Sequence, residues 1–86
     1  MADVKIYRTS YCPYCDMAER MFREMDVDFE EIDVTNDPET RKELAEKTGM
    51  RTVPQIFIDG ESIGGFDEAR AMRASGELEE ILKGSA

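Results

Sequence analysis

The residues whose chemistry stands out are two cysteines, Cys12 and Cys15, in the stretch Cys12-Pro13-Tyr14-Cys15. Side chains at this spacing lie on one face of a helix, so the two thiols can close a disulfide with little movement of the backbone. In a reducing compartment, a lone pair of this spacing near a strand–helix–strand pattern is typical of thiol–disulfide exchange. The pair therefore predicts a redox-active disulfide, Cys12–Cys15.

The position of each thiol relative to the predicted helix separates their roles. Cys12 comes directly before the helix, where unpaired backbone N–H groups and the helix dipole stabilise an anion, so we predict that Cys12 is the nucleophilic thiolate. Pro13 suits the first helical position, because its missing N–H would have no partner there. Cys15 lies in the first turn, where burial would keep it protonated until Cys12 is in a mixed disulfide. Cys15 is therefore predicted to be the resolving thiol.

Two other interpretations of the cysteine pair stay open. Cysteine is among the most often buried residue types, so both thiols could be inert core side chains. Two thiolates per chain could also form half of a metal or iron–sulfur site shared between two chains. The chain has no histidine and only two cysteines, which excludes a histidine base and leaves too few ligands for a zinc site within one chain. We therefore expect no bound metal.

The elements that must position the cysteines follow from the spacing of apolar residues. A short buried strand is predicted at 4–7, and after the cysteines apolar side chains recur at helical spacing. The methionines of this helix, Met17, Met21 and Met25, are interpreted as core residues. A second strand is predicted at 27–34, and its many acidic residues suit a sheet edge. Strand, helix and strand then form a parallel unit.

Start and stop signals define the second half of the chain. A helix over 38–48 has Pro38 at its first position and Gly49 at its end. Two strands flank the turn signal Asp59-Gly60 and predict a hairpin, and two further helices are separated by Gly76. The predicted segments are the strands 55–58 and 61–63 and the helices 67–75 and 77–82. This βαβαββα order predicts an α/β fold with a small mixed sheet and helices on its faces.

Length and charge limit the possible functions. With 86 residues, the chain is expected to be a single domain over 1–86, because its halves would be too small to bury a core. The net charge of −9 argues against nucleic acid or an anionic membrane as a partner. No basic segment precedes a long apolar run, and no apolar stretch approaches the length of a bilayer span. We therefore expect a cytoplasmic monomer.

Three motifs in this order resemble the dithiol glutaredoxins, and the resemblance covers nearly the whole chain. They are Cys12-Pro13-Tyr14-Cys15, Thr52-Val53-Pro54 before the hairpin, and Gly64-Gly65-Phe66-Asp67 after it. The resemblance implies a thioredoxin-like fold with a four-stranded mixed sheet. It also implies a thiol–disulfide oxidoreductase that uses glutathione as reductant and acts on protein–glutathione mixed disulfides and on protein disulfides.

The resemblance further implies where glutathione binds. Val53–Pro54, next to Thr52, would be a cis peptide facing the cysteines, with the Val53 backbone free to pair with glutathione as an added strand would. In the segment Gly64-Gly65-Phe66-Asp67, backbone N–H groups at the start of the helix would take the γ-glutamyl carboxylate, and Asp67 would take the amino group. Asp67 could instead merely cap its helix. Tyr14 would pack beside the sulfur and the ligand, or else face solvent.

One position departs from the family pattern. Glutaredoxins commonly hold the glycyl carboxylate of glutathione with a basic residue three positions before the nucleophile, and here Thr9 occupies that position. Arg8 lies one step earlier, and a shift of one residue along an extended segment turns its side chain to the other face. Arg51 is therefore the better candidate for this contact, although an exposed arginine can also be plain solvated surface.

Two alternative functions stay open beside glutathione-dependent reduction. One is an electron donor, for instance to ribonucleotide reductase, that is recharged by thioredoxin reductase. The other is a carrier of an iron–sulfur cluster, in which two chains hold one cluster through Cys12 and glutathione. Pro13 argues mildly against the carrier, because it stiffens the turn that would have to open toward a partner chain.

Overall fold

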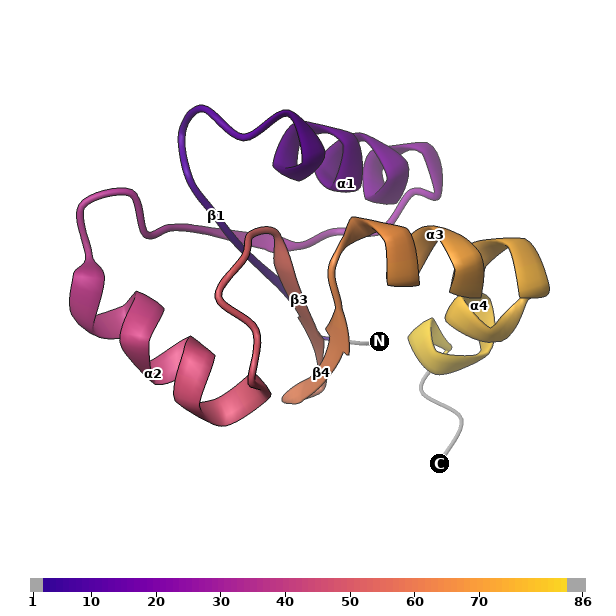
Figure 1. Ribbon diagram of the computed structural model, residues 1–86. Helices are drawn as coiled ribbons and strands as arrows, with labels where there is room; N and C mark the ends of the chain where they lie inside the picture. The colour runs from indigo at the N-terminus through magenta and orange to yellow at the C-terminus, as the bar shows by residue number, and fades with distance from the viewer. Residues whose placement is uncertain (1–2, 84–86) are drawn as a thin grey trace.

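The four strands form one mixed sheet in the order β2-β1-β3-β4 (Figure 1), in a computed structural model that describes residues 3–83. The order of elements along the chain agrees with the prediction, with the last helical region divided in two at Gly76. The elements are β1 Val4–Arg8, α1 Pro13–Glu24, β2 Glu30–Asp33, α2 Pro38–Thr48, β3 Gln55–Ile58, β4 Glu61–Gly64, α3 Phe66–Ser75 and α4 Glu77–Leu82.

Strand β1 lies inside the sheet and makes both kinds of pairing. It is parallel to β2 and antiparallel to β3, and β3 and β4 form the predicted antiparallel hairpin. Strand β2 is an edge strand, as its acidic residues predicted, but it is shorter than the predicted segment 27–34. Val27 and Phe29 pack against the core before the strand pairing begins, so they belong to the connection from α1.

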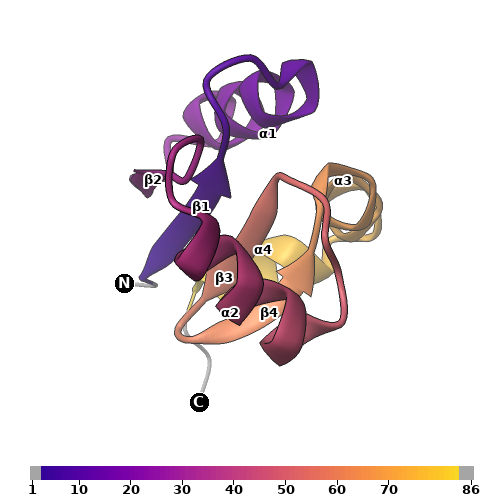
Figure 2. The same cartoon turned by 60° about the vertical axis from the view of Figure 1, so that its left-hand side comes forward.

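The two faces of the sheet are covered differently. Alternate residues of β1 and β3 point to one face, where Ile6 and Ile56 pack against α1, α3 and α4. The opposite face meets α2 through Leu44, which lies near Tyr7 and Phe57. Figures 1 and 2 show α2 on the side of the sheet away from α1 and α3. The main core comprises Val4, Ile6, Ala18, Met21, Phe22, Ile56, Ile58, Phe66, Ala69 and Leu78.

A buried ion cluster joins the end of β1 to α1 and β2. The Arg8 guanidinium lies 2.8 Å from Asp16 Oδ1, 3.2 Å from Glu19 Oε1 and 4.0 Å from Glu31 Oε2. Its Nε also donates a hydrogen bond to the Thr9 carbonyl at 3.0 Å. The side chains of Arg8 and Glu19 are only 9% and 3% exposed. This cluster fixes the first turns of α1 against the sheet.

Glu19 is the most deeply buried residue of the cluster, and its charged form is the one that burial disfavours. Burial, reinforced by the nearby Glu31 carboxylate, raises the pKa of Glu19, and Arg8 opposes that rise. One carboxylate oxygen of Glu19, Oε2, is buried without a hydrogen-bond partner among the described residues. The charge of Arg8 therefore compensates a carboxylate that burial would otherwise disfavour.

Removing the cation should therefore destabilise the protein. We expect Arg8→Met to lower the free energy of unfolding by about 3 kcal/mol, because Glu19 would remain buried with only the exposed and more distant Arg23, 3.5 Å away, as its cationic partner. The loss should be larger near pH 8 than near pH 5, since a carboxyl with a raised pKa regains a proton at the lower pH. Urea unfolding of wild type and variant at both pH values measures this loss in the free energy of unfolding. The double variant Arg8→Met, Glu19→Met should recover most of the lost stability, and a double variant no more stable than Arg8→Met would contradict this account.

Candidate functional site

Cys12 is the residue that caps α1, as its position directly before the helix predicted. Its Sγ accepts a hydrogen bond from the Cys15 N–H at 3.2 Å, and Pro13 occupies the start of the helix. The helix continues through the hydrogen bond from the Asp16 N–H to the Cys12 carbonyl at 3.1 Å. The cap is therefore a sulfur atom held at the N-terminal end of the helix, where the helix dipole is positive.

The two thiols differ sharply in exposure. Cys12 is partly exposed, whereas Cys15 is completely buried. Burial, with a smaller effect of the adjacent Cys12, raises the pKa of the Cys15 thiol to about 12, and the Thr9 backbone and Arg8 act in the opposite direction. Cys15 therefore keeps its proton at neutral pH. An inert core role would fit the environment of Cys15, but it does not fit the exposed, hydrogen-bonded sulfur of Cys12.

The loop before β3 lies directly against Cys12. The Val53–Pro54 peptide is cis, as the family resemblance implied, and the Cys12 thiol lies 3.6 Å from the Val53 carbonyl oxygen. On its other side the loop approaches the start of α3. A Cβ atom added to Gly65 would lie 3.2 Å from the Pro54 carbonyl, so any larger residue would press on the loop.

These segments enclose an open groove of about 370 Å³ beside Cys12. Seven of the nine residues predicted to contact glutathione line this groove, and they come from three separate sequence motifs. They are Tyr14, Thr52, Val53, Pro54, Gly65, Phe66 and Asp67. Arg51 is exposed and lies in a neighbouring hollow with residues of α2, while Arg8 is held in its buried ion cluster. Glutathione binding by these residues stays a prediction.

Two further residues of the groove, Met50 and Glu68, were missed in the sequence analysis. Glu68 carries a detectable signal, because an acidic residue three positions after a helix cap commonly hydrogen-bonds back to the cap. The Gly65 N–H donates that hydrogen bond to Glu68 Oε1 at 2.6 Å. Met50 carries no such signal, since it precedes β3 in an irregular segment.

The residue that caps α3 is Gly65 and not Asp67. Gly65 is the capping position and Glu68 makes the return hydrogen bond, so the interpretation of Asp67 as a plain cap is wrong. Asp67 is exposed at the mouth of the groove. Helix geometry leaves the N–H groups of the first turn without intrahelical partners, so those of Phe66 and Asp67 can bind an anion.

Aromatic and sulfur side chains continue the surface along α1. Tyr14 is 57% exposed, and its ring centroid lies 6.4 Å from that of Phe66. Met17 is 43% exposed, so its interpretation as a core residue is wrong, whereas Met21 is buried as predicted. Tyr14, Met17 and Met21 are spaced by three and four residues, so they lie along one side of α1. The packing of α3 against α1 decides which of them are covered: Met21 is buried, whereas Tyr14 and Met17 are exposed.

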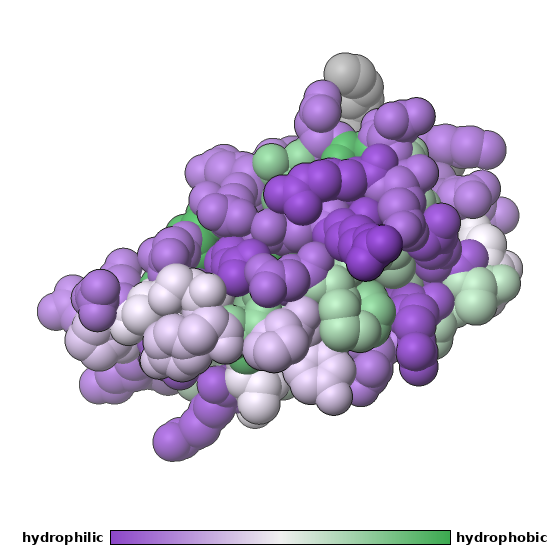
Figure 3. All heavy atoms as spheres, turned by 90° about the horizontal axis from the view of Figure 1, so that it is seen from above, coloured by the Kyte–Doolittle hydropathy of each residue, from purple (hydrophilic) through white to green (hydrophobic). Residues whose placement is uncertain are grey.

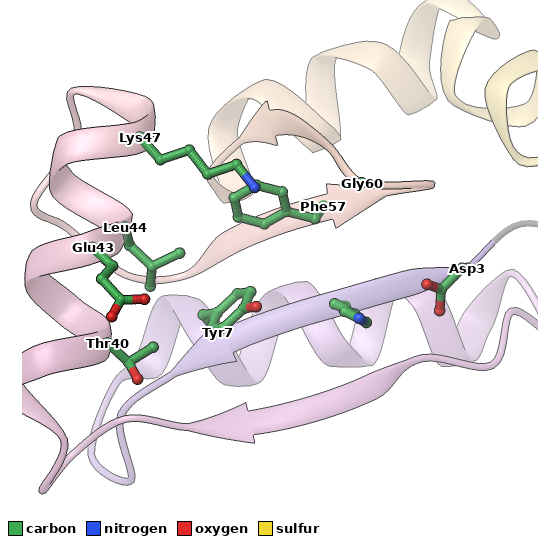
Figure 4. A pocket seen from close by; sticks show the side chains of 9 residues that line it. Asp3, Tyr7, Thr40, Glu43, Leu44, Lys47, Phe57 and Gly60 are labelled. Atoms are coloured by element: carbon green, nitrogen blue, oxygen red, sulfur yellow. The ribbon is translucent and has the colours of Figure 1, made fainter.

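A second groove, of about 200 Å³, lies on the sheet face that α2 covers (Figure 4). Tyr7 packs edge-on against Phe57, with centroids 5.5 Å apart, and the Lys47 ammonium lies 5.2 Å from the Phe57 ring centroid. Its lining includes both lysines and acids but neither cysteine. It therefore offers no group for thiol chemistry.

Within residues 3–83, no group of three or more histidine, cysteine, aspartate or glutamate side chains is arranged to hold a metal ion. In the same part of the chain, no helix is both long enough and apolar enough to cross a membrane.

The comparisons with known proteins agree with this geometry. The Glutaredoxin family model matches residues 4–63. Glutaredoxin from Pseudomonas aeruginosa is 44% identical over 82 residues, which cover 95% of this chain and 98% of that protein. Glutaredoxin 3 from Escherichia coli is 41% identical over 83 residues, covering 96% of this chain and all of that protein.

Solved structures show the same fold. The buckwheat glutaredoxin–glutathione complex superposes with a TM-score of 0.91 at 27% identity, covering 95% of this chain and 77% of that one. The solution structure of glutaredoxin from Brucella melitensis gives a TM-score of 0.87 at 41% identity, covering 96% and 90%. The predicted thioredoxin-like fold is therefore confirmed.

A capped helix with an exposed and a buried thiol, facing a cis-proline loop, defines a thiol–disulfide oxidoreductase of thioredoxin-like fold. Within that class, the chain belongs to the glutaredoxin family.

The different burial of the thiols should appear in their reactivity. In the reduced native protein, iodoacetamide should modify Cys12 and spare Cys15, because Cys15 is buried and its thiol has a pKa of about 12. Mass spectrometry of peptides locates the label. In the matched variant Cys12→Ser, Cys15 should react only after unfolding in urea, and equal labelling rates in the native and unfolded states would contradict the prediction.

The same burial makes stability depend on pH. The unfolded thiol titrates near pH 8.5, below its folded pKa of about 12, so the stability that protonated Cys15 contributes is present below about pH 8.5 and is lost as pH rises toward 12. Urea unfolding of reduced Cys12→Ser across this range should show the decline, and Cys12→Ser, Cys15→Ser should lack it.

Two glycines with positive φ, Gly60 just before β4 and Gly64 at its last position, should respond differently to alanine. Gly60→Ala should cost about 1 kcal/mol, because its φ of +85° is unfavourable but the space around it is open. Gly64→Ala should cost about 3 kcal/mol, since its φ is +101° and its Cβ would lie 2.8 Å from Glu68 Cγ. Urea unfolding measures the free energy of unfolding of the two variants. Equal losses would contradict the prediction, because they would mean that the Glu68 side chain moves away from the new Cβ without cost.

Proposed function

We propose that this chain reduces protein–glutathione mixed disulfides with glutathione as the reductant, and that it also reduces protein disulfides. The observation that carries the proposal is the partly exposed Cys12 sulfur, which caps α1 and lies 3.6 Å from the Val53 carbonyl at the edge of the groove. This arrangement presents a sulfur atom next to the backbone of the loop before β3, which can pair with a peptide.

The first reaction needs only Cys12. Its thiolate attacks the glutathione sulfur of the mixed disulfide, a new Cys12–glutathione disulfide forms, and the substrate protein leaves as a thiolate that takes up a proton. A second glutathione thiolate then attacks the bound glutathione sulfur. Oxidised glutathione leaves, and the Cys12 thiolate is restored.

Protein disulfides require Cys15 as well. Cys12 attacks one sulfur of the substrate disulfide and forms a mixed disulfide with the protein. Cys15 then attacks the Cys12 sulfur, its proton passes to the departing substrate thiolate, and the Cys12–Cys15 disulfide remains. Two glutathione molecules reduce that disulfide. The high pKa of Cys15 slows its attack, which gives glutathione time to resolve the mixed disulfide directly.

The groove supplies a recognition site of matching chemistry. The Val53 backbone can pair with glutathione as an added strand, and the N–H groups of Phe66 and Asp67 suit the γ-glutamyl carboxylate. The Asp67 carboxylate suits the amino group. The buckwheat relative was solved as a complex with glutathione, which supports the same ligand here. Arg51 is exposed and adjoins the groove residue Thr52, so it is the proposed partner of the glycyl carboxylate. Arg8 is itself buried and is held by Asp16 and the buried Glu19.

A reducing compartment is implied by this chemistry, because the resting state must hold two free thiols. We therefore propose that the protein works in the cytoplasm.

The two cysteines give the decisive test. Cys15→Ser should retain reduction of a small glutathione mixed disulfide at a rate within about threefold of wild type, because that route does not use Cys15. Cys12→Ser should have no activity. The coupled oxidation of NADPH by glutathione reductase measures both.

Reduction of a protein disulfide separates the two routes, since Cys15→Ser should lose it. Activity in Cys12→Ser would overturn the assignment of the nucleophile. Wild-type protein that is recharged by NADPH and thioredoxin reductase, but not by glutathione, would overturn the proposed reductant.

A further inference from the structure

A groove of about 260 Å³ runs between α1 and α3, next to the site described above. Its apolar lining comes from Met17, Met21 and Phe66, and charged side chains surround it. Figure 3 looks onto α1 and shows hydrophobic side chains lying among strongly hydrophilic ones on this face. We call this feature the arginine groove, after its charged residues Arg20, Arg70 and Arg73, which accompany Glu24.

The arginine groove is locally positive in an acidic protein. Three guanidinium groups surround it, against one carboxylate, while the chain as a whole carries a net charge of −9. Glu24 is shared by two of the arginines, at 3.7 Å from Arg20 and 3.3 Å from Arg73. Arg70 lies over the ring of Phe66, 5.8 Å from its centroid. One carboxylate cannot neutralise three cations, so the groove retains positive charge for a ligand.

The groove is continuous with the candidate site. Phe66 lines both the arginine groove and the groove beside Cys12, and Tyr14 lies against the same ring. Along α1, the side chains of Tyr14, Met17 and Met21 follow one stripe that starts beside Cys12. From Cys12 to Met21 the helix rises about 14 Å, which an extended peptide of about four residues would cover.

Another basic hollow provides a comparison. Arg41, Lys42 and Arg51 lie with Glu46 at the end of α2, which gives the same balance of three cations and one acid. No large apolar side chain lines that hollow, and exposed cations without an apolar floor are ordinary solvated surface. The arginine groove differs because it joins its charge to exposed apolar surface at Met17, which is 43% exposed.

We propose that the arginine groove binds the acidic, partly apolar segment that adjoins the reactive cysteine of a protein substrate. The proposal rests on the proposed function, because Cys12 must attack a protein disulfide. The occupant should carry acidic residues and a large aliphatic side chain within about four residues of its cysteine. Methionine adapts to different apolar side chains, and the arginines supply charge complementarity.

The net negative charge of the protein does not prevent this contact. At physiological ionic strength, charges more than about 8 Å apart are largely screened, so the nearby arginines outweigh distant acids.

Binding can be tested without catalysis. The probe is a short fluorescent peptide with two acidic residues and a leucine before a serine that replaces its cysteine, compared with the same peptide carrying asparagine for the acids. The double variant Arg20→Gln, Arg70→Gln should weaken binding of the acidic peptide about fivefold and leave the neutral peptide unchanged. The control Arg41→Gln, Lys42→Gln makes the same change in net charge at the other basic hollow and should bind like wild type.

Catalysis then separates this proposal from the proposed function. With the cysteine peptides as glutathione mixed disulfides, Arg20→Gln, Arg70→Gln should lower kcat/KM for the acidic peptide about fivefold. Its kcat/KM for a small mixed disulfide without a peptide should stay within about twofold of wild type, since neither arginine lines the groove beside Cys12.

Several outcomes would overturn the docking proposal. They are equal binding of the acidic and neutral peptides by wild type, an equal loss in the Arg41→Gln, Lys42→Gln control, or a concentration-dependent dimer that Arg20→Gln, Arg70→Gln abolishes. By contrast, selective peptide binding by a wild-type protein that cannot reduce the small mixed disulfide would overturn the proposed function and leave the docking proposal standing.

Discussion

The fixed first turn of α1 is the constraint on which the rest of the site depends. Because Cys12 caps this helix, its sulfur is held by the Cys15 N–H and lies at the positive end of the helix dipole. The buried cluster around Arg8 holds the same turn from below by binding Asp16 and Glu19. The cis-proline loop approaches it from the other side, at Val53. The reactive sulfur is therefore positioned by backbone groups and buried charge, which leave its outer side free for a substrate.

Two thiols of one type obtain different chemistry from this geometry. The helix turns Cys15 into the core while Cys12 stays partly exposed, and burial, with a smaller effect of the adjacent Cys12, raises the pKa of Cys15 far above that of a free thiol. The proposed order of the steps, attack by the outer sulfur and resolution by the inner one, rests on where one turn of helix places each side chain.

Two recognition surfaces meet at Phe66. On one side lies the groove of the cis-proline loop and the start of α3, with backbone groups that suit a small peptide-like ligand. On the other side lies the arginine groove, in which three arginines and one glutamate surround apolar methionine and phenylalanine side chains. The ring is buried at 9% exposure and serves as a rigid wall between them. Under the proposed function, glutathione and a protein substrate would share the Cys12 sulfur without sharing all their contacts.

The sequence by itself determined the elements, their order, the hairpin and the cap at Cys12, because these depend on local signals such as periodicity, turn residues and helix-start chemistry. The resemblance of three short motifs to the glutaredoxins also predicted most of the residues that line the groove beside Cys12. Only the tertiary structure decided that Arg8 is buried among carboxylates and that Met17 faces outward. Each of these depends on which neighbour covers a side chain, and the spacing of residues along the chain does not contain that information.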